Sequence, residues 1–184
     1  MKRTKFAFIM QVTAAVTALL TCVAVAIYLY TAKDLYLTLA ITFGTTCYHF
    51  AMRLLVGVLV PSRLHWKSRW FQPFPFESRL YAFLRVKQWK KQLPTYDPTL
   101  FSMKDYSLDQ IISHMCQAEV VHEIIVVCSF LPMFCSLVFG AFPVFLITSL
   151  ASACCDFLFI ILQRFNRPRL IRILHAQERR SGIV

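Results

Sequence analysis

The chain has 184 residues, of which 58% are hydrophobic and 15% aromatic, and its mean hydropathy is +0.57. These values exclude a soluble domain of this length and indicate an integral membrane protein. The net charge of +11 does not require a nucleic-acid partner, because no nucleic-acid-binding motif is present and basic residues beside apolar stretches favour anionic lipid headgroups. We therefore expect the lipid bilayer, and no nucleic acid, as a partner.

Four apolar stretches are long enough to cross a hydrocarbon core of about 30 Å, which takes roughly 20 helical residues. They cover about residues 6–30, 35–60, 120–139 and 142–162. The first is longer than the apolar region of a signal peptide, so we interpret it as a retained helix. The four stretches predict an all-α, polytopic protein that forms a single membrane domain over residues 1–184.

The basic residues predict the orientation of these spans. Three Lys or Arg residues precede the first span, nine lie between the second and the third, and six follow the fourth, whereas the short connections hold only Lys33. Basic residues concentrate in cytoplasmic loops. We therefore expect a multi-pass protein of the cell membrane with both termini, segment 61–117 and tail 163–184 on the cytoplasmic side.

Segment 61–117 contains a predicted amphipathic helix. Apolar residues recur every three or four positions from Phe76 to Leu93, basic residues take other positions, and Pro94 ends the pattern. A basic helix with Phe, Leu and Trp on one face, next to membrane spans, is typical of the membrane interface. We expect this interfacial helix between the second and third spans.

The next helix has a recognisable start. Ser107 and Gln110 fit a capping box, and no helix breaker follows before Pro132. One helix is therefore expected from Leu108 through the whole third span to Phe139. It is longer than the bilayer core, so its beginning must project from the membrane.

Polar clusters mark both ends of the hairpin that the third and fourth spans form. The entry carries Glu119, His122 and Glu123, and the exit carries Arg164, Asn166 and Arg167. A two-helix hairpin returns to the face where it started, so the two clusters are expected to lie close together. Ionisable groups at a membrane boundary are costly to desolvate and by default indicate function.

Two charged residues lie deeper within the predicted spans. Arg53 is about 12 Å and Asp156 about 10 Å from the cytoplasmic end of its helix, at 1.5 Å per residue. Their similar depth makes an Arg53–Asp156 ion pair plausible. The alternative is that Arg53 extends to the interface and Asp156 is neutral.

Several blocks of the sequence resemble the glycosyl-4,4'-diaponeurosporenoate acyltransferases. The blocks are Phe76-Glu77, the run from Leu84 through Trp89 to Pro94, Ala118 to His122, and Ile161 to Leu170 with its Gln-Arg-Phe-Asn-Arg-Pro-Arg core. The family's enzymes attach a fatty acyl chain to the sugar of a glycosylated carotenoid acid. The chain departs from the family pattern around the histidine, where it has His114, Gln117 and Glu123.

This resemblance implies an acyltransferase that acts on a lipid-like or glycolipid hydroxyl, with a glycosylated carotenoid as the implied acceptor. Acyl transfer needs a base and donors for the developing oxyanion. We expect His122 to be the base, with Glu119 or Glu123 orienting its ring. No cofactor is expected besides an acyl donor as co-substrate, such as acyl-CoA or another acyl carrier. Five residues are expected to bind substrate: Arg53, Trp89, Arg164, Asn166 and Arg167.

Three other interpretations use the same residues. Glu119 and Arg167 alone would form a structural pair that locks the hairpin. The Glu119-x-x-His122 spacing occurs in di-iron proteins, with His114 and Glu123 as further ligands, but the second motif that this site needs is missing, so no metal is expected. A non-catalytic transporter subunit or assembly factor is the third alternative.

Overall fold

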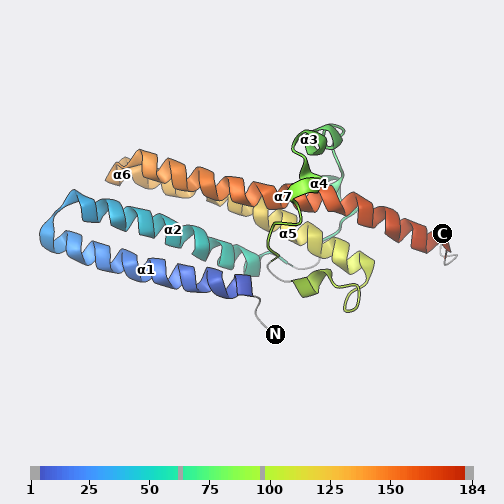
Figure 1. Ribbon diagram of the computed structural model, residues 1–184, viewed down its shortest axis with the longest axis horizontal. Helices are drawn as coiled ribbons and strands as arrows, with labels where there is room; N and C mark the ends of the chain where they lie inside the picture. The colour runs from blue at the N-terminus through green and yellow to red at the C-terminus, as the bar shows by residue number, and fades with distance from the viewer. Residues whose placement is uncertain (1–4, 62–63, 96–97, 181–184) are drawn as a thin grey trace. The chain divides into compact units, whose positions relative to one another are not determined.

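The structure is a computed structural model that describes residues 5–61, 64–95 and 98–180. Every regular element in these ranges is a helix, so the predicted all-α class is confirmed (Figure 1). The chain divides into two compact units. Unit 1 comprises Met1–Leu59 and Ile124–Asp156, and unit 2 comprises Val60–Glu123 and Phe157–Val184.

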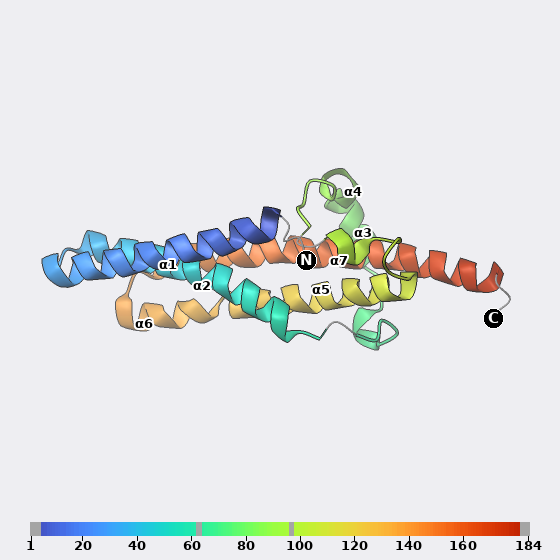
Figure 2. The ribbon, with the colours of Figure 1, turned by 90° about the horizontal axis from the view of Figure 1, so that it is seen from below.

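Unit 1 begins with an antiparallel hairpin of two long helices. These are α1 (Lys5–Thr31) and α2 (Asp34–Leu59), which lie side by side in Figures 1 and 2. Their threonine hydroxyls donate to carbonyls of the preceding turn, as in Thr21 to Thr17 at 2.7 Å. A polar side chain satisfied in this way adds no uncompensated donor to an apolar helix.

The third predicted span is helical but not continuous, contrary to the prediction. Helix α5 (Leu108–Cys128) ends before a 3₁₀ turn, η3 (Leu131–Cys135), which leads into α6 (Ser136–Phe139). Pro132 explains the change, because it lacks a backbone donor and disfavours helical geometry at the residue before it.

The fourth predicted span continues well beyond Leu162. Helix α7 runs from Phe142 to Arg180, so the expected tail is a helical extension as far as the described residues reach. Apolar residues of this extension explain it, because Leu170, Ile171 and Leu174 pack against a buried cluster within unit 2. That cluster consists of Trp66, Phe71, Ile112 and Cys116.

Four helical segments are long and apolar enough to cross a membrane, as predicted. They are Lys5–Thr31, Asp34–Leu59, Leu108–Phe139 and Phe142–Arg180. The prediction that both termini are cytoplasmic concerns in part residues 1–4 and 181–184. These residues lie outside the described ranges. The orientation of the spans stays a prediction.

The expected helix from Phe76 to Leu93 is two short helices instead. They are α3 (Glu77–Phe83) and α4 (Val86–Trp89), and the break lies at Arg85, whose φ of 51° is left-handed. The Trp89 indole donates to the carbonyl of Leu84 at 2.9 Å and closes the turn. An apolar period alone does not reveal this break, and the interfacial location stays a prediction. Two 3₁₀ turns, η1 (Arg69–Phe71) and η2 (Pro98–Phe101), complete unit 2.

The predicted capping box at the start of α5 is confirmed. The backbone N–H of Ser107 donates to Gln110 Oε1 at 2.9 Å, and the N–H of Gln110 donates to Ser107 Oγ at 3.3 Å. We expect Ser107→Ala to lower the free energy of unfolding by about 1 kcal/mol. The measurement is thermal unfolding in detergent followed by circular dichroism.

Ser68 provides the matched control for this prediction. It precedes η1 but makes no side-chain capping bond, so Ser68→Ala is expected to leave the unfolding midpoint nearly unchanged. Equal effects of the two substitutions would show that the cap at Ser107 contributes nothing specific.

Candidate active site

Glu119 is the centre of a buried ionic cluster in unit 2. Its side chain is fully buried on α5 and accepts hydrogen bonds from two arginines of α7. Arg164 Nη1 lies 2.6 Å from Glu119 Oε1, and Arg167 Nη1 contacts Glu119 Oε2. The two polar clusters therefore meet, and the ion pair between Glu119 and Arg167 that the structural alternative named is present.

The same arginines hold the irregular segment from Trp70 to Glu77. Arg164 Nε donates to Glu77 Oε1 at 2.8 Å, and its Nη2 donates to the carbonyl of Gln72 at 3.0 Å. Arg167 Nη2 donates to the carbonyl of Phe71 at 2.7 Å. We name this set of Glu77, Glu119, Arg164 and Arg167 the ionic clasp. It joins three stretches of chain and balances two carboxylates with two guanidinium groups.

Glu77 is a further member of the cluster that was not predicted from the sequence. The structure shows that its side chain is buried. Besides Arg164, it accepts a hydrogen bond of 2.8 Å from the Tyr81 hydroxyl. Burial and this hydrogen bond to Glu77 raise the pKa of Tyr81 above its ordinary range. The available signal was the acid in the Phe76-Glu77 block, at the start of an otherwise basic amphipathic pattern.

His122 lies one turn beyond Glu119 on α5 and is half-buried. Its ring is nearly parallel to that of Phe159 on α7, with an angle of 9° and 4.7 Å between the ring centroids. This stacking limits the rotation of the imidazole. The next residue, Glu123, accepts a hydrogen bond of 2.9 Å from the Trp70 indole.

Asn166 and Trp89 have separate roles in the structure. Asn166 Oδ1 accepts a hydrogen bond of 2.9 Å from Lys90 Nζ, and Lys90 lies 4.8 Å from the centroid of the Phe165 ring. Trp89 forms the turn bond to Leu84 described above. Lys90 is a site residue that was not predicted, since one lysine among the several basic residues of a predicted helix is indistinguishable from a solvated one.

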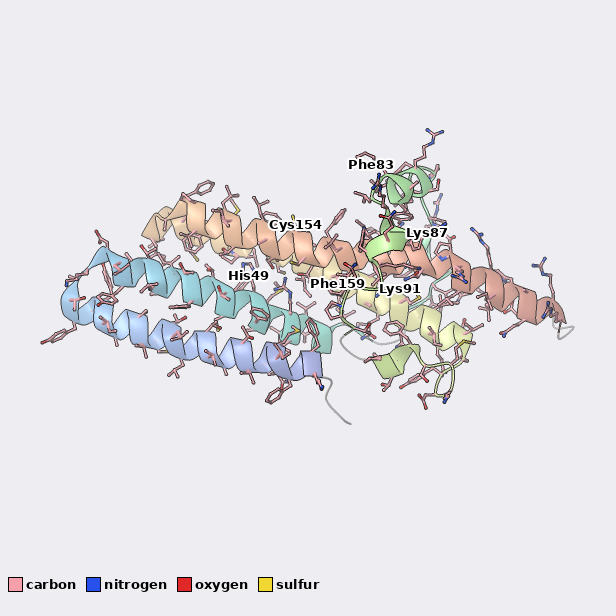
Figure 3. All side chains as sticks on the ribbon, in the orientation of Figure 1. His49, Phe83, Lys87, Lys91, Cys154 and Phe159 are labelled. Carbon is pink, nitrogen blue, oxygen red and sulfur yellow. The ribbon has the colours of Figure 1, made fainter. Side chains whose placement is uncertain are left out.

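Arg53 belongs to unit 1 and not to the ionic clasp. It forms the predicted ion pair with Asp156 and donates to Ser152 Oγ at 2.8 Å. The Ser152 and Ser129 hydroxyls are in turn 2.8 Å apart. His49, on the same face of α2, is buried, and Figure 3 shows it between α2 and α7. These groups form a second polar cluster, inside a candidate span.

Two cavities lie in unit 2. The first, of about 580 Å³, is bordered by the clasp residues Glu77 and Arg164, together with Tyr81 and Phe74. The second, of about 690 Å³, is bordered mainly by basic side chains of α4 and α7. The described lining of neither cavity includes His122, so the predicted base and the anion-binding residues are not joined by these cavities.

The departures from the family pattern have local partners in the structure. Gln117 Nε2 donates to the carbonyl of Val60 at 3.0 Å, and Glu123 binds Trp70. The ring of His114 packs edge-on against Tyr106, with 5.0 Å between the centroids. Among the described residues, no three His, Cys, Asp or Glu side chains are grouped so that they could hold a metal ion.

Four long apolar helices define a polytopic helical membrane protein. Its buried ionic cluster lies beside a histidine, between the middle parts of α5 and α7. Comparison with known families gives a match to glycosyl-4,4'-diaponeurosporenoate acyltransferase over residues 67–176. The chain belongs to this acyltransferase family. Comparisons with curated proteins and with solved structures find no match.

The ionic clasp predicts a large effect on stability. Glu119→Leu leaves the buried Arg167 without its carboxylate, and breaking a buried pair in this way costs about 3–5 kcal/mol. We expect a correspondingly lower unfolding midpoint in detergent. Adding Arg167→Met removes the uncompensated charge, so the double variant should be more stable than Glu119→Leu alone. A double variant no better than the single one would contradict the pairing.

The Arg53–Asp156 pair predicts a similar effect in unit 1. Asp156→Leu leaves a guanidinium in an apolar span and is expected to lower the unfolding midpoint, whereas Asp156→Asn keeps an acceptor and should lower it less. Cys154→Leu is the control, because Cys154 lies on an exposed face of the same helix (Figure 3). Equal midpoints for Asp156→Leu and the control would exclude a stabilising pair.

Proposed function

We propose that the protein transfers a fatty acyl group from a donor thioester to a hydroxyl of a glycosylated carotenoid or a similar lipid-like acceptor. The observation that carries this proposal is the family match, which includes Glu119, His122, Arg164, Asn166 and Arg167. Arg53 lies outside the matched residues and within unit 1. We therefore assign Arg53 to the structure of the spans and not to the site.

His122 is the proposed general base. It removes the proton from the acceptor hydroxyl while the hydroxyl oxygen attacks the thioester carbon. The attack forms the new carbon–oxygen bond and a tetrahedral intermediate. This intermediate collapses to the ester as the carbonyl re-forms and the carbon–sulfur bond breaks, and the proton passes from the imidazolium to the departing thiolate. Stacking on Phe159 supports this role, because it restricts the orientation of the ring.

The two arginines of the clasp differ in what they can do for the reaction. Arg164 borders the first cavity and also contacts Glu119, one turn of α5 from His122, which supports a role for its guanidinium in stabilising the oxyanion. Arg167 is 1% exposed and donates to Glu119 and Phe71, which supports a positioning role. Glu119 then acts through the arginines. Glu123 is held by Trp70 and is the remaining candidate to orient His122.

Lipid-like substrates fit the surroundings of this site. Phe74 and Phe76 are exposed, and their rings stack with 5.6 Å between centroids. Exposed apolar rings such as these can enter the boundary between lipid headgroups and acyl chains. We propose that the apolar part of the acceptor remains in the bilayer and that its sugar hydroxyl reaches His122.

The proposed base is tested by His122→Gln in a purified acyl transfer assay. Loss of a general base lowers the turnover rate by roughly 10²- to 10⁴-fold, and substrate binding and the unfolding midpoint should change little. His175→Gln is the matched control, because His175 is an exposed histidine of α7 outside the site. Normal turnover of the His122 variant would overturn the assignment.

A further inference from the structure

The second cavity of unit 2 is a groove between α4 and one face of α7, close to where Figure 3 places Lys87. We name it the basic groove. It has a volume of about 690 Å³ and is lined by Lys87, Lys90, Phe165, Asn166, Pro168, Arg169 and Arg172. On α7 the lining residues follow a spacing of three and four, so they occupy one face of the helix.

The described part of the chain supplies no carboxylate partner to the cations of this groove. Among the described residues, no carboxylate forms an ion pair with Lys87, Lys90, Arg169 or Arg172. Elsewhere in unit 2, Arg164 and Arg167 are both paired with buried carboxylates. The two groups of cations in unit 2 thus differ in whether a carboxylate accompanies them.

Lys90 is the most constrained of these cations. Its ammonium group is held between Asn166 Oδ1 and the face of Phe165. Burial, followed by the charges of Arg169, Lys91 and Lys87, lowers the pKa of Lys90. The protein therefore keeps like charges close together at a free-energy cost that a bound anion would relieve.

The geometry also indicates the kind of anion. Two arginines and two lysines around one hollow can contact several oxygens, and arginine binds phosphate through paired donors. The first cavity shares Lys87, Phe165, Pro168 and Arg172 with the groove, so the two are adjacent. It extends to Arg164, the group proposed to stabilise the oxyanion.

We propose that the basic groove binds the phosphate groups of the acyl donor, which is therefore a thioester on a soluble, phosphate-bearing carrier. The carrier's arm crosses Phe165 and Pro168 into the first cavity and brings the thioester to Arg164. This assignment rests on the proposed acyl transfer function. The same phosphate chemistry is offered by anionic lipid headgroups, and the experiment separates the two sources.

The test measures binding to the full chain in nanodiscs of zwitterionic lipid by titration calorimetry. The probes are coenzyme A and pantetheine, which share the thiol arm and differ in the phosphates. We expect coenzyme A to bind, more weakly at high ionic strength, and pantetheine to bind far more weakly. Arg169→Gln with Arg172→Gln should weaken coenzyme A binding roughly 10- to 100-fold.

Lys104→Gln with Arg179→Gln is the matched control, since it removes the same charge from exposed positions outside the groove. Size-exclusion chromatography and circular dichroism check the fold of each variant. Lys87→Gln tests the groove from α4 if the double variant is unstable. Equal binding of the two probes, or unchanged coenzyme A binding in a folded groove variant, overturns the proposal.

Nanodiscs that contain phosphatidylglycerol separate a lipid headgroup from a soluble carrier. If the groove variants lose retention of phosphatidylglycerol and the unaltered protein does not bind coenzyme A, the groove recognises a headgroup and the donor assignment is wrong. Groove-dependent coenzyme A binding without any acyl transfer would instead overturn the proposed function alone. Acyl transfer from another donor, without coenzyme A binding, would overturn the groove assignment alone.

Discussion

The arrangement of unit 2 depends on one buried carboxylate. Glu119 is withdrawn from water on α5, and two guanidinium groups of α7 compensate its charge. An unpaired charge at this position is costly. The pairing therefore fixes how α5, α7 and the segment from Trp70 to Glu77 are aligned along one another. His122, one turn along α5, acquires its place beside Phe159 from that alignment.

The helical period of α7 separates its basic residues into two groups with different chemistry. Arg164 and Arg167 face the ionic clasp and are neutralised by carboxylates. Arg169 and Arg172 project from another face, into the basic groove, where the described residues offer them no carboxylate. These four arginines all contribute to the predicted membrane orientation. Two of them stabilise the fold through ion pairs, and the other two are available to a ligand.

Prediction from the sequence succeeded where a local or one-dimensional signal governs the structure. Apolar length identified four spans, and the Ser107 capping box identified the start of α5. Prediction was wrong where a single residue's backbone geometry decides. Arg85 divides the expected amphipathic helix, and α5 ends before the turn that contains Pro132. The apolar spacing continues through both positions, so it did not predict either break.

The sequence by itself determined the four membrane spans, the acyltransferase family and the two polar clusters that meet at the hairpin's end, because hydrophobic length and local motifs are properties of the chain. Only the tertiary structure decided which charges are compensated. It paired Glu119 with both arginines, added Glu77 to the cluster and, among the residues that the structure describes, gave the cations of the basic groove no carboxylate partner. Burial and ion pairing depend on contacts between residues far apart in sequence, and their free energies have no counterpart in composition or spacing.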